Sequence, residues 1–328
     1  MPRRLGHCKL CELEDFTDPE LRELIRDVYA SDRRLFDEPD FPAGREYRKY
    51  WEVAMTLRAF SAFGLLREDA EVLGVGAGRE ATVYWLTQRV GRVVATDLYE
   101  LDDAWSATDS SADMLTDPGR FWDGPWDPSR LLVRNMDGRD LDFEDESFDA
   151  IFSSSSIEHF GDFGQVRRSV EEMFRVLRPG GVAALATEFR LEGPGIGPPG
   201  LLRFDEPELR SLLLDGLWWD PGTPLDLAIS EQTLAAPVQI ADAMADLESE
   251  RAGWTQYPHI VLRDGDYLWT SVHVALIKSG LPAAEWRRRA SRLPPGRRRS
   301  TSERVGSRLD GLRARARGAR GAARGAWS

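Results

Sequence analysis

The 328-residue sequence is poor in cysteine and histidine, with two of the former and four of the latter, and it has no long hydrophobic run. Two cysteines are too few for a disulfide framework, and their number is typical of a reducing compartment. No stretch approaches the 18 apolar residues of a membrane span. The basic start, MPRRLGHCKLCELEDF, has no apolar segment behind it, so we expect no secretory signal. These absences predict a soluble, cytoplasmic protein.

The two cysteines form a C-x-x-C motif, Cys8 to Cys11, with His7 beside it. Such a motif can begin a zinc site, but a structural zinc needs four ligands, usually from a second, similarly spaced pair. There is no further cysteine, and the other histidines stand in the body of the chain. We therefore expect two free thiols and no metal.

Charge is unevenly distributed along the chain. The net charge is −12, yet residues 287–328 hold fourteen Arg against two acids, Glu303 and Asp310. This stretch is too poor in apolar residues to offset its ordering entropy, so we predict a disordered Arg-rich tail over 282–328. We favour a solvated extension, while contact with nucleic acid or with an anionic membrane surface stays open. The acidic body argues against a nucleic-acid substrate, because it would repel a phosphate backbone.

Short apolar strands alternate with helical patterns between residues 67 and 281. The strands are predicted over 71–75, 92–97, 131–137, 148–156 and 181–189, and the clearest helical patterns over 79–90 and 165–177. Continuous apolar strands separated by helices are typical of a parallel sheet covered on both faces. A last strand, 267–278, has no helix after it and is predicted to run antiparallel at or near an edge.

Residues 1–66 are predicted to form a helical extension that precedes this domain. Asp18 can cap a helix that begins at Pro19 and runs through Asp27. A second helix is predicted over 46–63.

A glycine-rich turn, GVGAGRE, follows the first predicted strand. Its glycines, Gly74, Gly76 and Gly78, let the backbone approach a ligand, and the next helix presents free N–H groups to an anion. Asp97 ends the following strand, where a carboxylate can bind both hydroxyls of a ribose. This half of the domain therefore predicts a nucleoside-binding unit of the Rossmann type. GAGREA also fits the dinucleotide pattern, so an NAD(P)-linked oxidoreductase stays open at this point.

Two later segments narrow the choice: NMDGRDLDFEDESFDAIFSSSSIEHF at 135–160 and MFRVLRPGGVAALATEF at 173–189. Their order and spacing resemble the class I S-adenosylmethionine-dependent methyltransferases, especially the small-molecule group. Asp137 matches the acid at the end of the family's third strand, and Asp142 stands where a proline is usual in the loop that follows. The resemblance covers 71–189 and the final strand. It implies an α/β, Rossmann-like class I methyltransferase fold, mostly parallel, with an antiparallel final strand and helices on both faces.

The resemblance also implies S-adenosyl-L-methionine as the cofactor. The glycine loop would hold its amino-acid end, Asp97 its ribose and the segment around Asp137 its adenine, with serines on the far side. The cofactor-binding residues implied in this way are Gly74, Gly76, Gly78, Asp97, Asp137, Gly138, Ser153, Ser154 and Ser155.

The sequence departs from the family pattern at two positions of the loop. Family members usually carry Asp or Glu at the place of Gly74 and a third glycine at the place of Glu80. The missing acid removes one contact to the ammonium group of the ligand. Glu80 or Glu71 is the candidate substitute.

His159 is the first candidate for a general base and Glu158 the second, because both follow the fourth strand on the rim where family acceptors bind. The alternative is that His159 only caps or packs the helix after it. Arg190, Glu188 and Glu192, at the end of the fifth strand, are predicted on the same rim, where they would orient a polar acceptor.

Two stretches exceed the minimal fold, 98–129 and 191–266, and are predicted to choose the acceptor. They contain tryptophans that either stack on a flat, hydroxylated acceptor or fill the core; these are Trp105, Trp122, Trp126, Trp218, Trp219 and Trp254. We expect methyl transfer to an O or N of a small-molecule acceptor, with a saccharide or related metabolite favoured. A non-catalytic binding protein on the same scaffold is the alternative.

Overall fold

The computed structural model describes residues 5–31, 39–99, 111–215, 217, 219–242 and 256–279. The predicted tail and three of the tryptophans, Trp105, Trp218 and Trp254, lie outside the described residues. The described part is built around one sheet with the strand order β4-β3-β2-β5-β6-β10-β9-β8, and β1 and β7 pair with β10. None of its helices is both long and apolar enough to cross a lipid bilayer.

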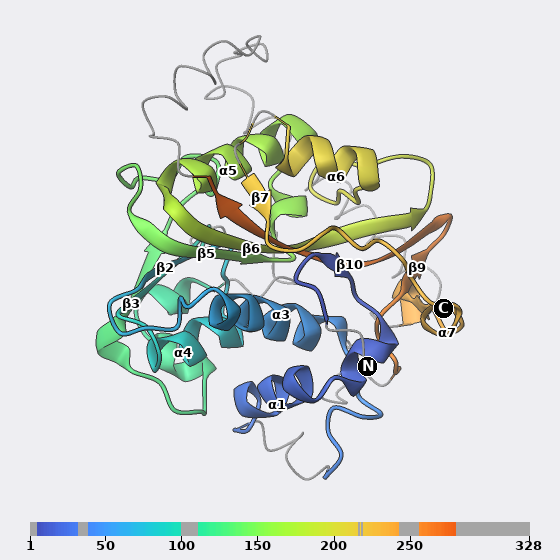
Figure 1. The fold of residues 1–328 in the computed structure, drawn as a ribbon, viewed down its shortest axis with the longest axis horizontal. Coiled ribbons are helices and arrows are strands. Elements are labelled where there is room, and N and C mark those ends of the chain that lie inside the picture. Colours follow the sequence, from blue (N-terminus) through green and yellow to red (C-terminus); the bar gives the residue numbers. More distant parts are fainter. Residues whose placement is uncertain are drawn as a thin grey trace, which may run out of the picture.

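The sheet combines a parallel half with an antiparallel half (Figure 1). Strands β2 to β6 are parallel to one another, and β10 runs antiparallel to β6. The order reverses between β2 and β5, which is where ligands bind in open α/β sheets. The strands are β1 (Lys9–Leu10), β2 (Glu71–Val75), β3 (Arg92–Asp97), β4 (Leu131–Asn135), β5 (Phe148–Ser154), β6 (Leu177–Glu192), β7 (Trp219–Pro221), β8 (Val238–Gln239), β9 (Leu262–Asp264) and β10 (Tyr267–Lys278).

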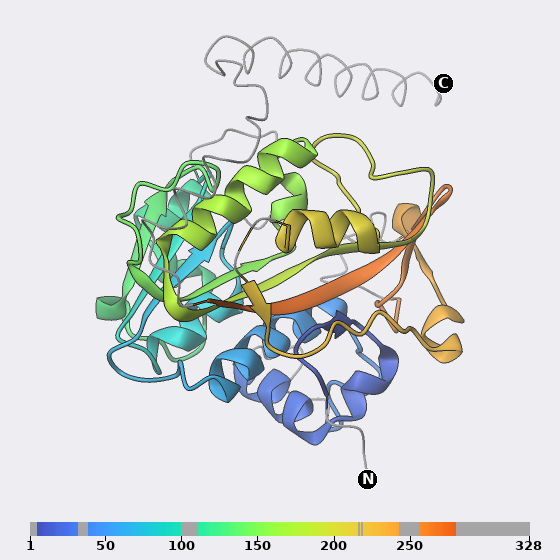
Figure 2. The same ribbon diagram turned by 45° about the horizontal axis from the view of Figure 1, so that its top comes forward.

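Helices cover both faces of the sheet, as predicted (Figures 1 and 2). One face carries α1 (Pro19–Val28), α3 (Arg48–Ala62) and α4 (Ala81–Thr87), and the other carries α5 (Phe163–Val176) and α6 (Glu206–Leu213). The shorter helices are α7 (Glu231–Leu234) and the 3-10 turns Leu13–Thr17, Ala112–Leu115, Pro118–Phe121, Pro128–Arg130 and Ile157–His159.

Local sequence signals fix the helix starts. The Asp18 carboxylate accepts a hydrogen bond from the Leu21 N–H at 2.9 Å, and Pro19 is the first residue of α1, which confirms the predicted cap. Helix α5 begins with a capping box between Asp162 and Gln165. Such caps satisfy N–H groups that have no partner inside the helix.

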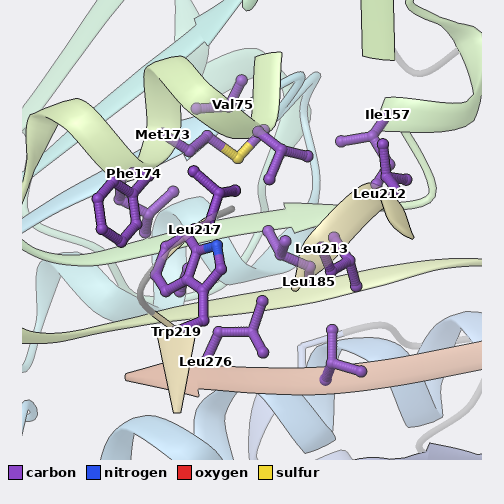
Figure 3. Close-up of a cluster of buried hydrophobic side chains, with 14 of the residues drawn as sticks. Val75, Ile157, Met173, Phe174, Leu185, Leu212, Leu213, Leu217, Trp219 and Leu276 are labelled. Atoms are coloured by element: carbon purple, nitrogen blue, oxygen red, sulfur yellow. The ribbon is translucent and has the colours of Figure 1, made fainter. Parts of the chain in front are cut away.

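The core lies in two layers that the sheet separates. On β2, Val72 packs with the α3 and α4 layer, whereas Leu73 packs with the α5 and α6 layer. In the second layer the ring of Trp219 meets Phe174 edge-on at 4.8 Å (Figure 3). Burying a side chain of this kind stabilises the fold by about 1.5–3 kcal/mol.

The final strand and the N-terminal region differ in detail from what the sequence predicted. Strand β10 runs antiparallel near one end of the sheet, as predicted, but it is not the edge strand, because β6 lies on one side of it and the short strands β1, β7 and β9 lie on the other. These strands satisfy backbone groups that a long edge strand would leave unpaired. The N-terminal region is not purely helical, since Lys9 of β1 pairs with His273 of β10. A strand of two residues is too short to show the alternation of apolar and polar residues from which strands are predicted.

Candidate functional site

The glycine loop joins the end of β2 to α4. Gly76 and Gly78 have φ values of 64° and 49°, which side chains disfavour. The Ser156 hydroxyl donates to the Gly76 carbonyl at 2.6 Å, and the Tyr99 hydroxyl donates to the Gly78 carbonyl at 2.7 Å. The loop is therefore held in one shape by side chains from both neighbouring strands.

Asp97 lies directly beside this loop. Its Oδ2 accepts the Gly78 N–H at 2.9 Å, and its Oδ1 accepts the Leu98 N–H at 2.7 Å. Burial raises the pKa of the Asp97 carboxyl, and the two N–H donors oppose that rise. The structure thus brings the residue predicted for the ribose into contact with the loop predicted for the amino-acid end.

Asp137 and Gly138 follow β4 on the same edge of the sheet. Hydrogen bonds from the Arg139 guanidinium, at 2.6 and 2.8 Å, hold the Asp137 carboxylate. Burial works against its ionisation, but these bonds outweigh burial, so the pKa of Asp137 is lowered. A Cβ on Gly138 would lie 2.8 Å from the Phe160 ring, and one on Gly76 would lie 3.0 Å from it. Phe160, which the sequence analysis missed, therefore packs against both predicted binding segments.

The serines at the end of β5 divide into two kinds. Ser153 and Ser154 have buried hydroxyl oxygens with no hydrogen-bond partner among the described residues. Buried polar atoms are rarely left without a partner, so both hydroxyls are able to bond to an ordered water or a ligand. Ser155, with a φ of 46°, instead donates to both carboxylate oxygens of Glu52 at 2.9 and 2.8 Å.

The packing around Gly74 explains why no acid stands there. A Cβ at this position would lie 2.5 Å from Cζ of Phe152 and 2.8 Å from Cβ of Ala77. Glu71 does not replace the acid, because it begins β2 at the far end from the loop and pairs with Arg92 at 2.6 Å. That candidate was wrong.

Glu80, the other candidate substitute, directly precedes α4 at the end of the loop. Its role as the substitute for the missing acid stays a prediction.

The two candidate bases occupy a 3-10 turn that follows β5. Nδ1 of His159 lies 2.8 Å from the Gly200 carbonyl oxygen. A carbonyl only accepts, so Nδ1 carries a proton, and in the neutral ring Nε2 then has the lone pair. Glu158 is 1% exposed and accepts from the Thr187 hydroxyl at 2.8 Å, and burial raises its pKa, as does Glu188, while His159 lowers it. His159 is thus the more accessible of the two.

Two of the three residues predicted to orient the acceptor have other partners. Arg190 is almost buried and binds Asp205 at 2.7 Å and Glu208 at 2.9 Å, so it fixes the start of α6. Glu192 pairs with Arg263 at 3.3 Å on an exposed surface.

The third, Glu188, joins a buried cluster that the sequence analysis missed. Nη1 of Arg48, on α3, lies 2.9 Å from Glu188, 3.2 Å from Glu52 and 2.9 Å from the Ser271 hydroxyl. Lys49 adds a second cation, 3.3 Å from Glu52. The pair of opposite charges four residues apart at the start of α3, Arg48 and Glu52, was the available signal.

The described tryptophans of the predicted acceptor insertions pack inward. Trp122 stacks on Tyr84 with ring centroids 5.3 Å apart, and Trp126 meets the same ring edge-on. Trp219 packs against Phe174, as described above. Trp219 therefore lies in the core, and Trp122 and Trp126 are partly buried against it.

The two cysteines flank β1 inside the protein. Cys8 and Cys11 are free, buried thiols. Burial raises the pKa of Cys11 well above its ordinary value, and Asp15 adds to this effect, so its thiol stays protonated. Among the residues that the structure describes, no three His, Cys, Asp or Glu side chains gather in a way that could hold a metal ion.

Comparison with known proteins supplies the family. Residues 73–185 match the family model described as a methyltransferase domain, a segment that begins in β2 and ends in β6. It includes the glycine loop, Asp97, Asp137, the three serines and His159.

Solved structures with a similar arrangement include three bacterial and archaeal proteins. The YcgJ protein of Bacillus subtilis is 16% identical, with a TM-score of 0.43, over 70% of this chain and 99% of its own. A SAM-dependent methyltransferase of Aquifex aeolicus is 17% identical, with a TM-score of 0.40, over 77% and 98%. One of Methanosarcina mazei is 17% identical, with a TM-score of 0.38, over 67% and 97%.

At such low identities and TM-scores, the assignment rests on the family match. The chain contains a class I S-adenosylmethionine-dependent methyltransferase domain, whose family uses S-adenosyl-L-methionine as the methyl donor.

Proposed function

We propose that this methyltransferase acts on an oxygen or nitrogen atom of a small, hydroxylated molecule such as a saccharide. The observation that supports the cofactor side of this proposal is the contact between Asp97 and the glycine loop, beside two serine hydroxyls that lack partners among the described residues. The acceptor class extends the family resemblance. All of these groups lie at the carboxyl ends of β2, β3 and β5, where the strand order reverses.

The residues at this edge suit the cofactor. Gly76 and Gly78 adopt positive φ, a backbone conformation that glycine allows, and they add no side chain to the loop that would hold the cofactor. Each oxygen of Asp97 accepts one N–H bond and keeps capacity for a second donor, as a ribose hydroxyl would be. When bound, the cofactor supplies a methyl group that is already activated by the positive charge on its sulfur.

We assign the cofactor-binding residues by these contacts and by the family pattern. The loop would hold the amino-acid end, Asp97 the ribose, and Asp137 with Gly138 the adenine. The residues that we propose are Gly74, Gly76, Gly78, Asp97, Asp137, Gly138, Ser153 and Ser154. Ser155 acts differently in this proposal, because Glu52 already holds its hydroxyl, and it links the site to α3.

His159 is proposed as the general base. The Gly200 carbonyl orients the ring through Nδ1, so Nε2 of the neutral ring is the atom that would take a proton from the acceptor. Loss of that proton turns a hydroxyl or ammonium group into a nucleophile. Holding acceptor and methyl group in line supplies the rest of the rate enhancement.

Calorimetric titration with S-adenosylhomocysteine, with NAD as the control ligand, tests the cofactor site. The wild-type protein is expected to bind the former and not the latter. Asp97→Asn should weaken binding about 10- to 100-fold, because a hydrogen bond to a charged group contributes about 1.5–3 kcal/mol. Asp140→Asn is the matched control, since Asp140 is exposed and lies outside the proposed site. Unchanged affinity in Asp97→Asn, with the far-UV spectrum of the wild type, would overturn the role of Asp97.

A further inference from the structure

Arg203 lies in the loop between β6 and α6, on the rim beside the candidate base. The residue before it, Leu202, donates its N–H to the Glu158 carbonyl at 3.2 Å. The residue after it, Phe204, donates its N–H to the Glu188 carbonyl at 2.9 Å. The backbone of Arg203 is therefore fixed between the end of the 3-10 turn and the end of β6.

The loop also contacts the base itself. The Gly200 carbonyl that holds Nδ1 of His159 lies three residues before Arg203. The Gly200 N–H donates to the Gly161 carbonyl at 2.9 Å, which ties the loop to the segment that follows His159. The same short loop thus orients the base and presents a cation.

Aromatic rings cover the flat face of the Arg203 guanidinium. Its Cζ lies 4.0 Å from the ring centroid of Trp269 and 4.8 Å from that of Tyr267. Stacking of this kind uses the face of the guanidinium and leaves its N–H groups pointing outward in the plane. The side chain is held in place by the rings while its donors stay available.

Few of these donors have a partner. Among the described residues, the one hydrogen bond of the side chain runs from Nη1 to the Leu201 carbonyl at 3.5 Å, the outer limit for such a bond. No described carboxylate forms an ion pair with Arg203 within 4.0 Å, although a guanidinium carries five N–H donors. By contrast, Arg48 and Arg190 each pair with two carboxylates.

The charges around Arg203 restrict what it can bind. Burial lowers the pKa of Arg203 and Arg48 lowers it further, while Glu188 and Asp264 raise it, and the guanidinium stays protonated. Arg48 already holds Glu188 at 2.9 Å. Because Glu188 and Asp264 both act on this cation, they would also repel an anion bound to it, and they would repel a singly charged anion less than a dianion.

We propose that Arg203 binds a carboxylate of the acceptor. This inference rests on the proposed function and names its substrate class: a small hydroxylated molecule that carries a carboxylate, such as a sugar acid. The planar carboxylate would take two parallel N–H bonds from the guanidinium edge. The methylated oxygen or nitrogen is a different atom of the same molecule, one that reaches Nε2 of His159.

Arginine side-chain NMR tests this without knowledge of the acceptor. The Nε–H resonances of the 15N-labelled full chain are recorded with saturating S-adenosylhomocysteine, and Arg203→Gln identifies the signal of Arg203. Sodium acetate is titrated against sodium chloride at equal ionic strength. We expect a saturable, acetate-specific shift of this signal, with a dissociation constant on the order of 10 mM for a single charged pair. The signal of Arg263, identified by Arg263→Gln, is the control and should respond equally to both salts.

Two outcomes overturn the proposal. One is an Arg203 signal that responds to acetate no more than to chloride. The other is tighter binding of inorganic phosphate than of acetate, which would assign the site to a dianion.

The test separates this inference from the proposed function. Arg203→Gln should bind S-adenosylhomocysteine with the affinity of the wild type, because Arg203 lies on the acceptor side. Failure of the Asp97 titration would affect the cofactor site and leave the acetate result standing.

Discussion

Gly74→Ala is expected to destabilise the protein, because no space exists for a side chain at this position. A Cβ there would lie 2.5 Å from the Phe152 ring and 2.8 Å from Cβ of Ala77, whereas ordinary contact begins at 3.4 Å. Both neighbours are buried, Phe152 completely, so neither can move into solvent. The backbone of Gly74 has no positive φ, so the cost is steric alone.

The size of the effect follows from two opposing contributions. Overpacking of a tight core costs about 1–3 kcal/mol. Alanine also lowers the conformational entropy of the unfolded chain relative to glycine, which stabilises the folded state by about 0.4–1 kcal/mol. We therefore expect a net loss of up to about 2.5 kcal/mol, or a fall in Tm of up to about 8 °C. Gly74→Asp, which restores the family's usual acid, should cost more because it also buries a carboxylate.

Thermal unfolding followed by circular dichroism measures this loss. Gly164→Ala, in the first turn of α5, is the matched control, because a Cβ there meets only Asp162 Oδ1 at 3.4 Å. It should leave Tm unchanged or raise it, since alanine favours a helix. The double variant Gly74→Ala/Phe152→Leu should lose less than the sum of its parts, because leucine vacates the space that the ring fills.

A Gly74→Ala variant at least as stable as the wild type would contradict the predicted clash with Phe152. Strict additivity of the two substitutions in the double variant would contradict it as well. An unchanged Tm for Gly74→Asp, together with tighter binding of S-adenosylhomocysteine, would mean that Phe152 does not exclude the acid.

Two further predictions concern the histidines. His159→Ala should lower methyl transfer by about 100-fold or more with unchanged affinity for S-adenosylhomocysteine; an unchanged rate would leave His159 with a structural role only. Burial lowers the pKa of His273 to about 4 and that of His259 to about 3, from 6.5. Between pH 6.5 and 4 the unfolded chain therefore takes up protons that the folded protein does not, and stability should fall by about 1.4 kcal/mol per pH unit for each histidine. His273→Asn should reduce the drop in Tm between pH 7 and pH 5, and an equal drop would contradict this.

Local sequence patterns were sufficient to predict most helices and strands of the fold and the residues proposed for the cofactor. The apolar strands, the cap of α1 and the glycine turn each depend on residues a few positions apart, so their signals survive in the linear sequence. The approach of Asp97 to the loop was also predictable, because parallel strands place their carboxyl ends at one edge.

The acceptor side was not predictable in this way. Arg190 was predicted to lie on the rim and to orient the acceptor, but two acids at the start of α6 bind it. Arg203, by contrast, stacks on Trp269 and pairs with no described carboxylate. Both arginines lie near the end of β6, and no pattern in the sequence distinguishes them. Which acid each one meets depends on how the loop folds back over the sheet.

Short-range periodicity and turns are enough to predict the class of fold, the glycine loop and the order of the proposed cofactor-binding residues, so these could be read from the amino-acid sequence. Only the tertiary structure decided the interior place of β10, the exclusion of an acid at Gly74 by Phe152 and the buried cluster that joins Arg48 to Glu188, 140 residues away. Pairing between residues so far apart in the chain is set by how whole helices pack against the sheet. The type of one residue therefore does not reveal which residue it contacts.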